Sequence, residues 1–337
     1  MKKITLLLPY FGNAFPNTFP LLLDSMYKND KINFIVFTNI ETKKLDREQR
    51  NVEFIHTDLK KIREQASDIV GFNVNLYEPY KLCDFRPLYG LIFKKYLNES
   101  DWWGHFDSDI IFGNLNSFVE STVFDHYEKV FTGGPLTFYK NTDRVNNLCL
   151  SNFDIKGVPS YRDVFSSSAS FGYDEWGKGK NRGRGISWII DHTSIISQYS
   201  NKKLYADILP NQPGFIMDHG VVNDSELNVG EKIRYFKYGI DGSLNGIDFN
   251  NKKYEYIFAH FQKRNLLNDV VQTNNAYKDI YIYPNFISNK YIPDYRMSLD
   301  DIKTWRKEFQ KRKIKHFWSH LTIDNLKLRV KFINQEK

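Results

Sequence analysis

Cysteine is scarce in this 337-residue sequence, which contains Cys83 and Cys149 and no others. Two cysteines cannot build a disulfide framework, so small disulfide-stapled secreted domains are excluded and a reducing compartment is indicated. Long apolar runs are also missing, since no stretch approaches the about 20 residues of a membrane span. The N-terminal run Ile4–Leu8 is far shorter than a signal-peptide core. We therefore expect a cytoplasmic protein.

The sequence also lacks internal repeats and low-complexity linkers, and its composition is ordinary for a globular protein. Hydrophobic residues make up 41% and charged residues 26%, which excludes intrinsic disorder and collagen. A chain of this length buries a large core in one large or two ordinary domains. Aromatic residues are frequent, at 16%. They are typical of proteins that handle sugars or bases, but an aromatic-rich core accounts for most of them.

The net charge of +7 is not spread over the chain. Residues 303–337 hold 11 Lys or Arg and 3 Asp or Glu, which leaves 36 basic and 37 acidic residues elsewhere. The main body is thus neutral and the C-terminal segment is basic. A nucleic-acid-binding protein usually spreads positive charge along a binding face, so we expect no nucleic-acid partner.

Strand and helix signals alternate in the first third of the chain, as in a parallel sheet covered by helices on both faces. In such a sheet, ligands bind beyond the carboxyl ends of the strands. The patterns predict strands at Ile4–Leu8, Phe34–Phe37, Val52–Ile55 and Trp102–Phe106, and helices at Phe19–Tyr27, Leu59–Val70 and Pro87–Leu97.

The regularity fades from about residue 133. We expect a helix over 186–199, a late strand over Tyr254–Phe261 and a basic helix over 298–320. The Gly-rich stretch 177–185 lacks the spacing of a phosphate-binding loop. One interpretation is an active-site lid whose cations approach donor phosphates or anionic lipid. The other is a solvated loop. The cations are Lys178, Lys180, Arg182 and Arg184.

The strongest chemical signal is the pair Asp107 and Asp109, which directly follows the predicted strand Trp102–Phe106. Residues i and i+2 of an extended chain point to the same side, so both carboxylates could face one ligand. Paired carboxylate oxygens suit Mg²⁺ or Mn²⁺, which in turn can bridge to a diphosphate. The alternative is an ordinary strand-to-loop turn with solvated carboxylates.

Three segments in this order resemble the GT-A-fold, nucleotide-sugar-dependent glycosyltransferases, especially bacterial enzymes of capsule and surface-polysaccharide synthesis. They are Pro-Tyr-Phe-Gly at 9–12, Lys-Leu-Cys-Asp-Phe-Arg-Pro at 81–87 and His-Phe-Asp-Ser-Asp at 105–109. The resemblance covers about residues 1–265 and implies an α/β, GT-A-like (Rossmann-like) mixed and mostly parallel sheet with flanking helices; the pattern over 298–320 adds a basic C-terminal helical extension. It implies a catalytic domain over 1–265, with a nucleotide-binding half at 1–130 and an acceptor-side half at 131–265, followed by an extension over 266–337.

The resemblance further implies that Asp107 and Asp109 hold Mn²⁺ or Mg²⁺ together with the donor diphosphate. Such enzymes often take a third metal ligand, commonly a histidine, from near the end of the catalytic domain, where this chain has His260. Lys263 and Arg264 follow and could neutralise phosphate charge. The alternative for His260 is an ordinary histidine in an aromatic strand.

In the resembled fold, the loops after the first two strands hold the base and ribose, and the segment before Pro87 lies near the donor. The predicted nucleotide-sugar-binding residues are Pro9, Tyr10, Phe11, Gly12, Thr38, Asn39, Asp84, Arg86, Asp107, Ser108 and Lys263. The alternatives are plain packing of these loops, a solvated Arg86 and a local helix-capping role for Asp84.

An inverting transfer needs a general base near the acceptor hydroxyl. Asp174 and Glu175 lie beside Trp176, and an aromatic ring can stack on a sugar face. We prefer Glu175 over Asp174 as the catalytic base, with Asp218 as the rival; surface solvation is the alternative for each.

The C-terminal segment 303–331 mixes cations with Trp and Phe, a pattern typical of helices that lie on anionic membranes. Docking of its aromatic face on the protein body is the alternative. Membrane contact would suit a lipid-linked acceptor and a position on the inner face of the membrane.

These observations together predict a metal-dependent glycosyltransferase that moves a hexose from a UDP-sugar, with galactose as first guess, to a glycan or lipid-linked oligosaccharide, with inversion. One alternative is a catalytically silent glycan-binding or scaffold protein with the same fold. The other is a sugar-phosphate nucleotidyltransferase, which normally has a Gly-rich loop after the first strand, where this chain has Pro9–Asn13.

Overall fold

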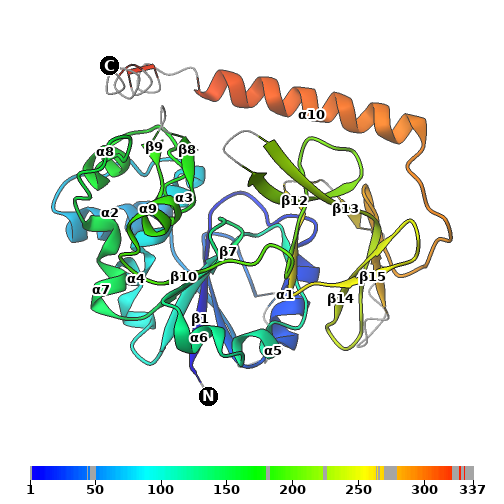
Figure 1. Cartoon of the computed structure of the whole chain (residues 1–337), viewed down its shortest axis with the longest axis horizontal. Helices are drawn as coiled ribbons and strands as arrows, with labels where there is room; N and C mark the ends of the chain where they lie inside the picture. The colour runs from blue at the N-terminus through cyan, green and yellow to red at the C-terminus, as the bar shows by residue number, and fades with distance from the viewer. Residues whose placement is uncertain are drawn as a thin grey trace.

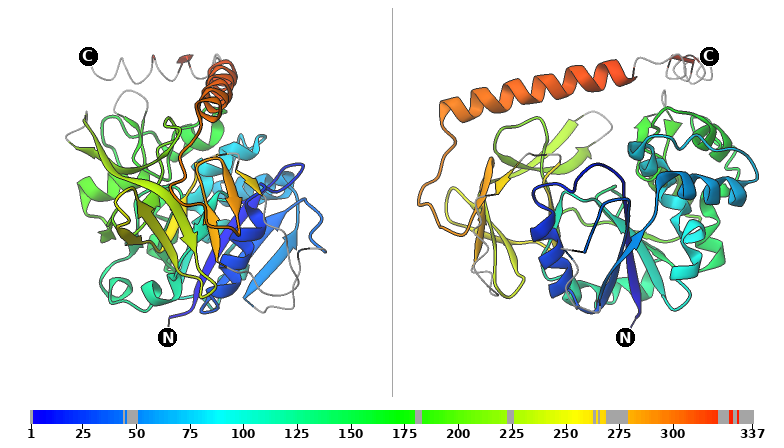
Figure 2. Two further views of the ribbon diagram at one scale, coloured as in Figure 1. Left: turned by 90° about the vertical axis from the view of Figure 1, so that its right-hand side faces the viewer. Right: turned by 180° about the vertical axis from the view of Figure 1, so that it is seen from behind.

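The computed structural model describes residues 2–43, 45, 51–179, 183–222, 226–262, 264, 266–268, 279–320, 326, 327 and 330. A central sheet with helices on both sides forms one part of the molecule, and a second, mostly antiparallel sheet lies beside it (Figure 1). The long helix α10 (Leu299–His320) runs along one face of the molecule, outside both sheets (Figures 1 and 2).

The central sheet is mixed and mostly parallel. Its order over the described residues is β10-β6-β7-β4-β1-β2-β3. The β10/β6, β4/β1, β1/β2 and β2/β3 pairs are parallel, and β7 is antiparallel to both of its neighbours. The strands are β1 (Ile4–Tyr10), β2 (Ile32–Thr38), β3 (Val52–His56), β4 (Trp102–Phe106), β6 (Lys129–Val130), β7 (Leu136–Lys140) and β10 (Gln198–Tyr199).

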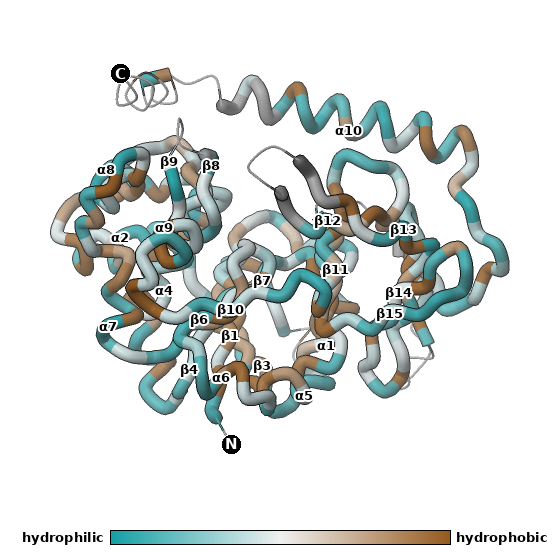
Figure 3. The backbone as a smooth tube through the Cα atoms, viewed as in Figure 1, coloured by the Kyte–Doolittle hydropathy of each residue, from teal (hydrophilic) through white to brown (hydrophobic). Residues whose placement is uncertain are grey.

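Both faces of this sheet are buried, which explains the continuous apolar runs of its strands. In β1, Leu6 and Leu8 pack into one core cluster with helix α1, while Leu7 packs into a second cluster on the opposite face. Alternate side chains of a strand point to opposite faces, so a wholly apolar strand needs a helical layer on each side. Figure 3 shows α10 mainly in teal, with isolated brown positions along it.

The helices that cover the sheet are mostly short. In α2, Ile62, Ala66 and Val70 repeat every four residues and form the buried stripe, Asp58 caps the start, and Gly71 ends the helix at a positive φ of 74°. The α-helices before α10 are α1 (Phe19–Lys28), α2 (Leu59–Val70), α3 (Leu82–Phe85), α4 (Tyr89–Ile92), α5 (Leu115–Val119), α6 (Val123–His126), α7 (Asp143–Asn146), α8 (Tyr161–Ser166) and α9 (Ile186–Thr193), and the 3₁₀ turns are Pro79–Lys81, Arg86–Leu88, Lys94–Tyr96 and Leu148–Leu150.

A small three-stranded sheet lies between the two large ones. Its order is β11-β16-β5, with β11 (Ala206–Asp207) parallel and β5 (Ile110–Phe112) antiparallel to β16 (Phe258–His260). It joins segments from three distant parts of the chain.

The second large sheet has the order β15-β14-β13-β18-β19-β17, and β12 also pairs with β13. Its strands are β12 (Phe215–Val222), β13 (Glu226–Tyr238), β14 (Leu244–Asp248), β15 (Lys253–Glu255), β17 (Leu267–Asn268), β18 (Ile280–Ile282) and β19 (Phe286–Ser288). Phe236 and Tyr238 pack on Leu21 of α1, so α1 connects the two large sheets.

Helix α10 (Leu299–His320) is largely exposed. Ile302, Trp305 and Phe309 are partly buried, and the Trp305 and Phe309 rings stack with centroids 5.1 Å apart. Residues 310–315 are exposed. Within the described part of the chain, no helix has the length and apolar character needed to cross a membrane.

The predicted fold class is confirmed: a mixed α/β architecture with a mostly parallel central sheet, flanking helices and a basic C-terminal helix. The predicted helix over Pro87–Leu97 is wrong. The segment instead forms short separate turns, because Phe93 leaves helical geometry (φ −102°, ψ 16°) and stacks on Phe37, with ring centroids 4.2 Å apart. The predicted helix over 186–199 is shorter than expected, since α9 ends at Thr193.

Strands on both sides of residue 265 share the second sheet, since β18 pairs with β13. The domain boundaries given above stay a prediction. The Gly-rich stretch forms a small hairpin of β8 (Gly177–Gly179) and β9 (Gly183–Arg184), while Lys180 and Arg182 lie outside the described residues.

Candidate metal centre

The turn between β4 and β5 carries the two aspartates. β4 ends at Phe106, and Asp107 follows at the carboxyl end of the central sheet, where its backbone N–H donates to the carbonyl of Pro135 (2.9 Å). Asp109 directly precedes β5. The chain thus leaves the central sheet at Asp107 and enters the small sheet after Asp109, with Ser108 between them.

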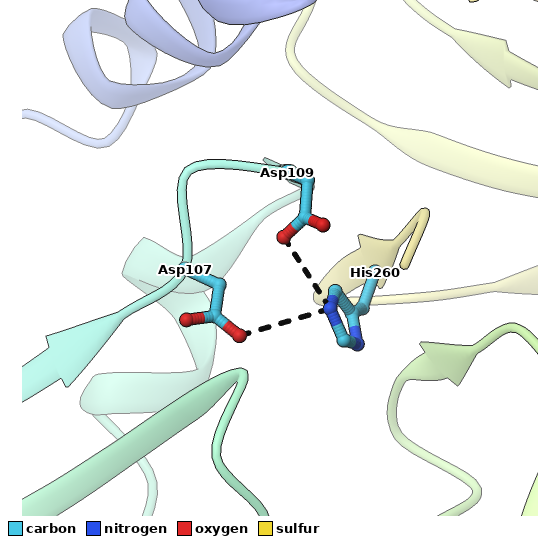
Figure 4. A group of neighbouring side chains, drawn as sticks. All are labelled: Asp107, Asp109 and His260. Atoms are coloured by element: carbon cyan, nitrogen blue, oxygen red, sulfur yellow. Dashed lines mark ion pairs between the residues drawn. The ribbon is translucent and has the colours of Figure 1, made fainter. Parts of the chain in front are cut away.

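His260 reaches the aspartates through pairing of β16 with β5. Ile110 lies opposite His260 in this register, and the Phe261 N–H donates to the Asp109 carbonyl (2.9 Å). His260 Nε2 then lies 3.4 Å from Asp109 Oδ1 and 3.7 Å from Asp107 Oδ2 (Figure 4). One ligand atom from each of the three side chains lies within 4.8 Å of the others.

The electrostatics of the cluster favour a cation. Burial alone would lower the pKa of His260, but the Asp109 and Asp207 carboxylates outweigh it and raise this pKa well above its usual value. Burial raises the pKa of Asp107; the Arg86 guanidinium opposes this shift, and the Asp109 carboxylate adds to it. Carboxylates gathered around one imidazole therefore create a negative site that a cation would relieve.

The donor set fits a divalent metal. Ligand atoms about 2.0–2.1 Å from an ion lie about 3–4 Å from each other, which agrees with the separations of His260 Nε2 from the two carboxylates. Two carboxylate oxygens and one imidazole nitrogen suit Mn²⁺ and tolerate Mg²⁺. Side-chain exposure of 26% for Asp107 and 20% for Asp109 leaves the cluster open to a ligand.

Sequence reasoning missed Asp207 and Gln262 beside this cluster. His260 Nδ1 and Gln262 Nε2 each lie 2.8 Å from Asp207 Oδ1. Asp207 follows the apolar run 204–206, as Asp107 follows an apolar run, and this pattern could have identified Asp207 from the sequence. Asp207 itself ends strand β11, which has only two residues, too few to be recognised from sequence.

Arg86 joins the metal cluster to the predicted catalytic acids. Its guanidinium pairs with the Asp107 carboxylate through Nη2, and Nη1 lies 2.7 Å from Asp174 Oδ2 and donates to the Gly134 carbonyl (3.1 Å). Arg86 and Asp174 are both buried. A Cβ on Gly134 would overlap the Glu175 carboxylate, so this glycine allows a close approach of that side chain.

Glu175 is partly buried and faces the same region. Burial, followed by the Asp174 carboxylate, raises the pKa of Glu175 to about 7, with further contributions from Asp107 and Asp207. Burial also raises the pKa of Asp174, although Arg86 opposes the shift. A carboxyl group with a pKa near neutrality is suited to accept a proton at physiological pH.

The rival base, Asp218, lies in β12 of the second sheet. Burial first, and then the carboxylates of Asp207, Asp218 and Glu175, raise the pKa of Tyr205. Over the described residues, Asp218 does not belong to the ligand set of Asp107, Asp109 and His260.

Asp84 lies apart from the metal cluster. Its carboxylate is fully buried, pairs with Lys81 Nζ (2.8 Å) and accepts from the backbone N–H groups of Phe171 and Tyr173. These bonds anchor the segment that leads to Asp174. Contact of Asp84 with a donor stays a prediction.

The two predicted nucleotide loops lie side by side. The Gly12 N–H donates to Asn39 Oδ1 and Asn39 Nδ2 donates to the Gly12 carbonyl, each at 3.0 Å. Tyr10 pairs with Thr38 in the β1/β2 register, and its ring stacks on Phe15 with centroids 5.2 Å apart. Burial and then Asp109 raise the pKa of Tyr10, whose hydroxyl donates to the Ala14 carbonyl (3.1 Å).

Other predicted site residues have different surroundings. Phe11 packs into the core cluster with Leu7, and Pro9 lies within β1, opposite Phe37. Lys263 lies outside the described residues. Arg264 is buried, and its guanidinium donates to the backbone carbonyls of Leu209, Gln212, Pro213 and Gly214.

The chain belongs to a family of unknown function, DUF6625, whose model matches residues 6–291. No curated protein matches the sequence. Among solved structures, it is similar to the galactosyltransferase LgtC, crystallised with donor and acceptor sugar analogues, at 8% identity and a TM-score of 0.33 over 60% of this chain and 75% of that chain. It is also similar to the mannosyltransferase Ktr4p from S. cerevisiae, at 13% identity and a TM-score of 0.23 over 39% of each chain. Both likenesses are too distant to assign an activity.

Proposed function

We propose that this protein is a GT-A-like, metal-dependent glycosyltransferase that moves a hexose from a nucleoside diphosphate sugar to a glycan hydroxyl. The observation that carries the proposal is the convergence of Asp107, Asp109 and His260 at the carboxyl end of the central sheet. Ligands of open α/β sheets bind at this edge. The proposed donor is a UDP-hexose, with UDP-galactose as first candidate.

A divalent ion bound by these three residues would act as a Lewis acid that stabilises the leaving diphosphate. Mn²⁺ is preferred over Mg²⁺ because one of the three ligands is an imidazole nitrogen. Arg86, beside Asp107, adds a fixed positive charge on the side of the proposed general base. Ser108 lies in the turn between the two aspartates, and we include it in the donor site.

The proposed base and ribose site lies at the paired loops of Gly12 and Asn39, with Tyr10 and Thr38 beside them. The Tyr10 ring can stack on a nucleobase, a contact worth about 1–3 kcal/mol per base. Phe11 contributes through the core beneath the loop. Pro9, Asp84 and Lys263 complete the proposed set, and their contacts with a donor are predictions.

Glu175 is the proposed general base, and its raised pKa supports this role. In an inverting transfer, Glu175 accepts the proton of the acceptor hydroxyl as the oxygen forms its bond to the sugar. Asp174 holds Arg86 in place through its buried ion pair. A product that keeps the donor's anomeric configuration would contradict inversion and leave donor binding intact.

We propose a lipid-linked glycan as the acceptor in the synthesis of a bacterial capsule or surface polysaccharide, with residues 303–331 on the anionic inner face of the membrane. The exposed residues Ile314 and Trp318 and the many cations of α10 support this proposal. Each basic residue near such a surface contributes about 1 kcal/mol.

The membrane proposal is tested by sedimentation with vesicles that contain phosphatidylglycerol. Changing Lys311, Arg312, Lys313 and Lys315 to Gln should weaken binding about 10³-fold, since about 4 kcal/mol would be lost. A control that changes Lys60, Lys61, Lys94 and Lys95 to Gln should bind like the wild type, because these exposed lysines lie outside α10. Equal binding of both variants would refute the proposal.

The donor site is tested by thermal shift with UDP, GDP and CDP, with Mn²⁺ or EDTA, on the wild type and on Asp109→Ala. A ligand at 100 times its Kd stabilises the native state by about 2.7 kcal/mol. We expect a shift with UDP and Mn²⁺ that disappears with EDTA and in Asp109→Ala. Release of UDP from UDP-sugars then identifies the hexose.

The other outcomes identify the alternative functions. Metal-dependent UDP binding without transfer or hydrolysis of any UDP-sugar would indicate a silent scaffold protein. Formation of a nucleotide sugar from a sugar phosphate and a nucleoside triphosphate would indicate a nucleotidyltransferase. No shift with any nucleotide would refute the donor site.

A further inference from the structure

The histidine of the metal cluster has a partner on each ring nitrogen. Nε2 faces Asp107 and Asp109, while Nδ1 lies 2.8 Å from Asp207 Oδ1. The pairing of β11 with β16 places Asp207 directly opposite His260. Two neighbouring strands therefore hold the two side chains in register.

Asp207 is itself fixed by a second donor. Gln262 Nε2 donates to the same Oδ1 atom at 2.8 Å. Gln262 follows β16 with a positive φ of 42°, a left-handed conformation that is unfavourable for a residue with a side chain. Such conformations persist where the surrounding structure requires them, and here the turn brings the amide back onto Asp207.

We propose that Asp207 and Gln262 form a positioning pair for the metal ligand His260, an inference that rests on the proposed metal site. With a metal bound, the Nδ1–H of His260 would donate to Asp207, which leaves the Nε2 lone pair for the metal. Carboxylates that accept from metal-bound histidines fix the tautomer and the ring orientation in this way. Asp207 lies outside the ligand set formed by Asp107, Asp109 and His260, so it acts through the histidine.

The first test compares Mn²⁺ affinity, measured by the EPR signal of free Mn²⁺ at saturating UDP, in the full-length wild type and Asp207→Asn. Loss of a partner of this kind costs about 10–100-fold in metal affinity, and we expect this loss for Asp207→Asn. Asp207→Glu keeps a carboxylate and should recover part of the affinity. Asp248→Asn is the matched control, because that carboxylate caps a turn of the second sheet by accepting from Asn250 and Lys252.

A double-mutant cycle separates positioning from direct ligation and from general damage to the fold. In a His260→Ala background, Asp207→Asn should cause no further loss, because its target is gone. Gln262→Gly, which suits the left-handed backbone, should give a smaller loss than Asp207→Asn. The free energy of unfolding of each variant in EDTA shows whether its fold is intact.

The outcomes distinguish this inference from the proposed function. An unchanged Mn²⁺ affinity in folded Asp207→Asn, or an equal further loss in the His260→Ala background, would overturn the positioning role and leave the metal site standing. If Asp207→Asn does not fold, an unchanged affinity in Gln262→Gly overturns the role. Absence of Mn²⁺ binding in the wild type would overturn both this inference and the proposed metal site.

Discussion

The side chains of the candidate metal centre come from two different kinds of local structure. Asp107 lies in a loop at the end of a central strand, next to its partner in sequence, Asp109. His260 and Asp207 come from two short strands that pair only in the folded protein. Strand-end carboxylates are visible in a sequence, whereas residues brought together by pairing of distant strands are not.

The buried arginines sharpen this comparison. Arg86, on the central-sheet side, pairs with two carboxylates of the proposed site. Arg264, on the other side, binds four backbone carbonyls in the loop 209–214. The first arginine contacts residues of the proposed site and the second a loop, and the prediction for Arg264 below tests this contrast.

The largest effect is expected at Glu175. Replacing it with Gln removes the proposed base while it keeps the shape of the side chain, and general-base catalysis contributes about 10²–10⁴-fold. We expect kcat for sugar transfer to fall by this factor, while UDP and Mn²⁺ affinity, measured by calorimetry, stays unchanged. Full activity in Glu175→Gln would move the role to Asp174 or Asp218.

Asp84 should affect stability strongly. Asp84→Ala leaves the Lys81 ammonium buried without its partner, and breaking such a pair costs about 3–5 kcal/mol. Urea unfolding measures this loss. The double change Lys81→Met with Asp84→Leu should recover only part of it, because this buried charge pair is gone but the N–H groups of Phe171 and Tyr173 lose their acceptor. A stable Asp84→Ala protein that has lost UDP binding would instead identify Asp84 as a donor ligand.

Arg264 should affect stability and leave nucleotide binding unchanged. Arg264→Met keeps most of the side-chain volume but removes the donors to the loop carbonyls, at a cost of about 1–3 kcal/mol. Urea unfolding and UDP titration with Mn²⁺ on the same preparation separate the two properties. Loss of UDP affinity with unchanged stability would break the comparison and return Arg264 to the phosphate site that its sequence position suggests.

The last prediction is that the rate of sugar transfer depends on pH through Glu175. Glu175 must be deprotonated to act as a base, and its pKa is raised to about 7. Activity should therefore fall tenfold for each pH unit below about 7 and level off above it. Initial rates measured from about pH 5 to about pH 9 test this. The decrease in activity below about pH 7 should disappear in Glu175→Gln.

Much of the central sheet could be predicted because its signals are local. The apolar runs of β1, β2 and β4 mark strands buried on both faces, and Leu59–Val70 carries a complete helical pattern with its cap. The helix expected over Pro87–Leu97 was wrong because stacking of Phe93 on Phe37 overrides local preference.

In the candidate site, too, the residues with a local sequence signal could be predicted and the others could not. Asp107 and Asp109 follow a recognisable strand, His260 was expected from the family resemblance, and the three residues lie together. Asp207 escaped notice because a two-residue strand has no period to detect. The surroundings of Asp84 and Arg264 were hidden for another reason: a charged residue before a helix or after a strand looks the same whether it faces a ligand or a buried backbone.

The pairing of β16 with β5 also determines the stage of synthesis and folding at which the three side chains can come together. Asp107 and Asp109 are synthesised about 150 residues before His260, yet the cluster needs all three. Contacts between distant segments form late, since a long loop must close first. A nascent chain whose synthesis has stopped before β16 could hold a folded central sheet and still lack the cluster. Metal binding would therefore report that synthesis and folding have passed β16, and would stabilise only chains that contain this strand.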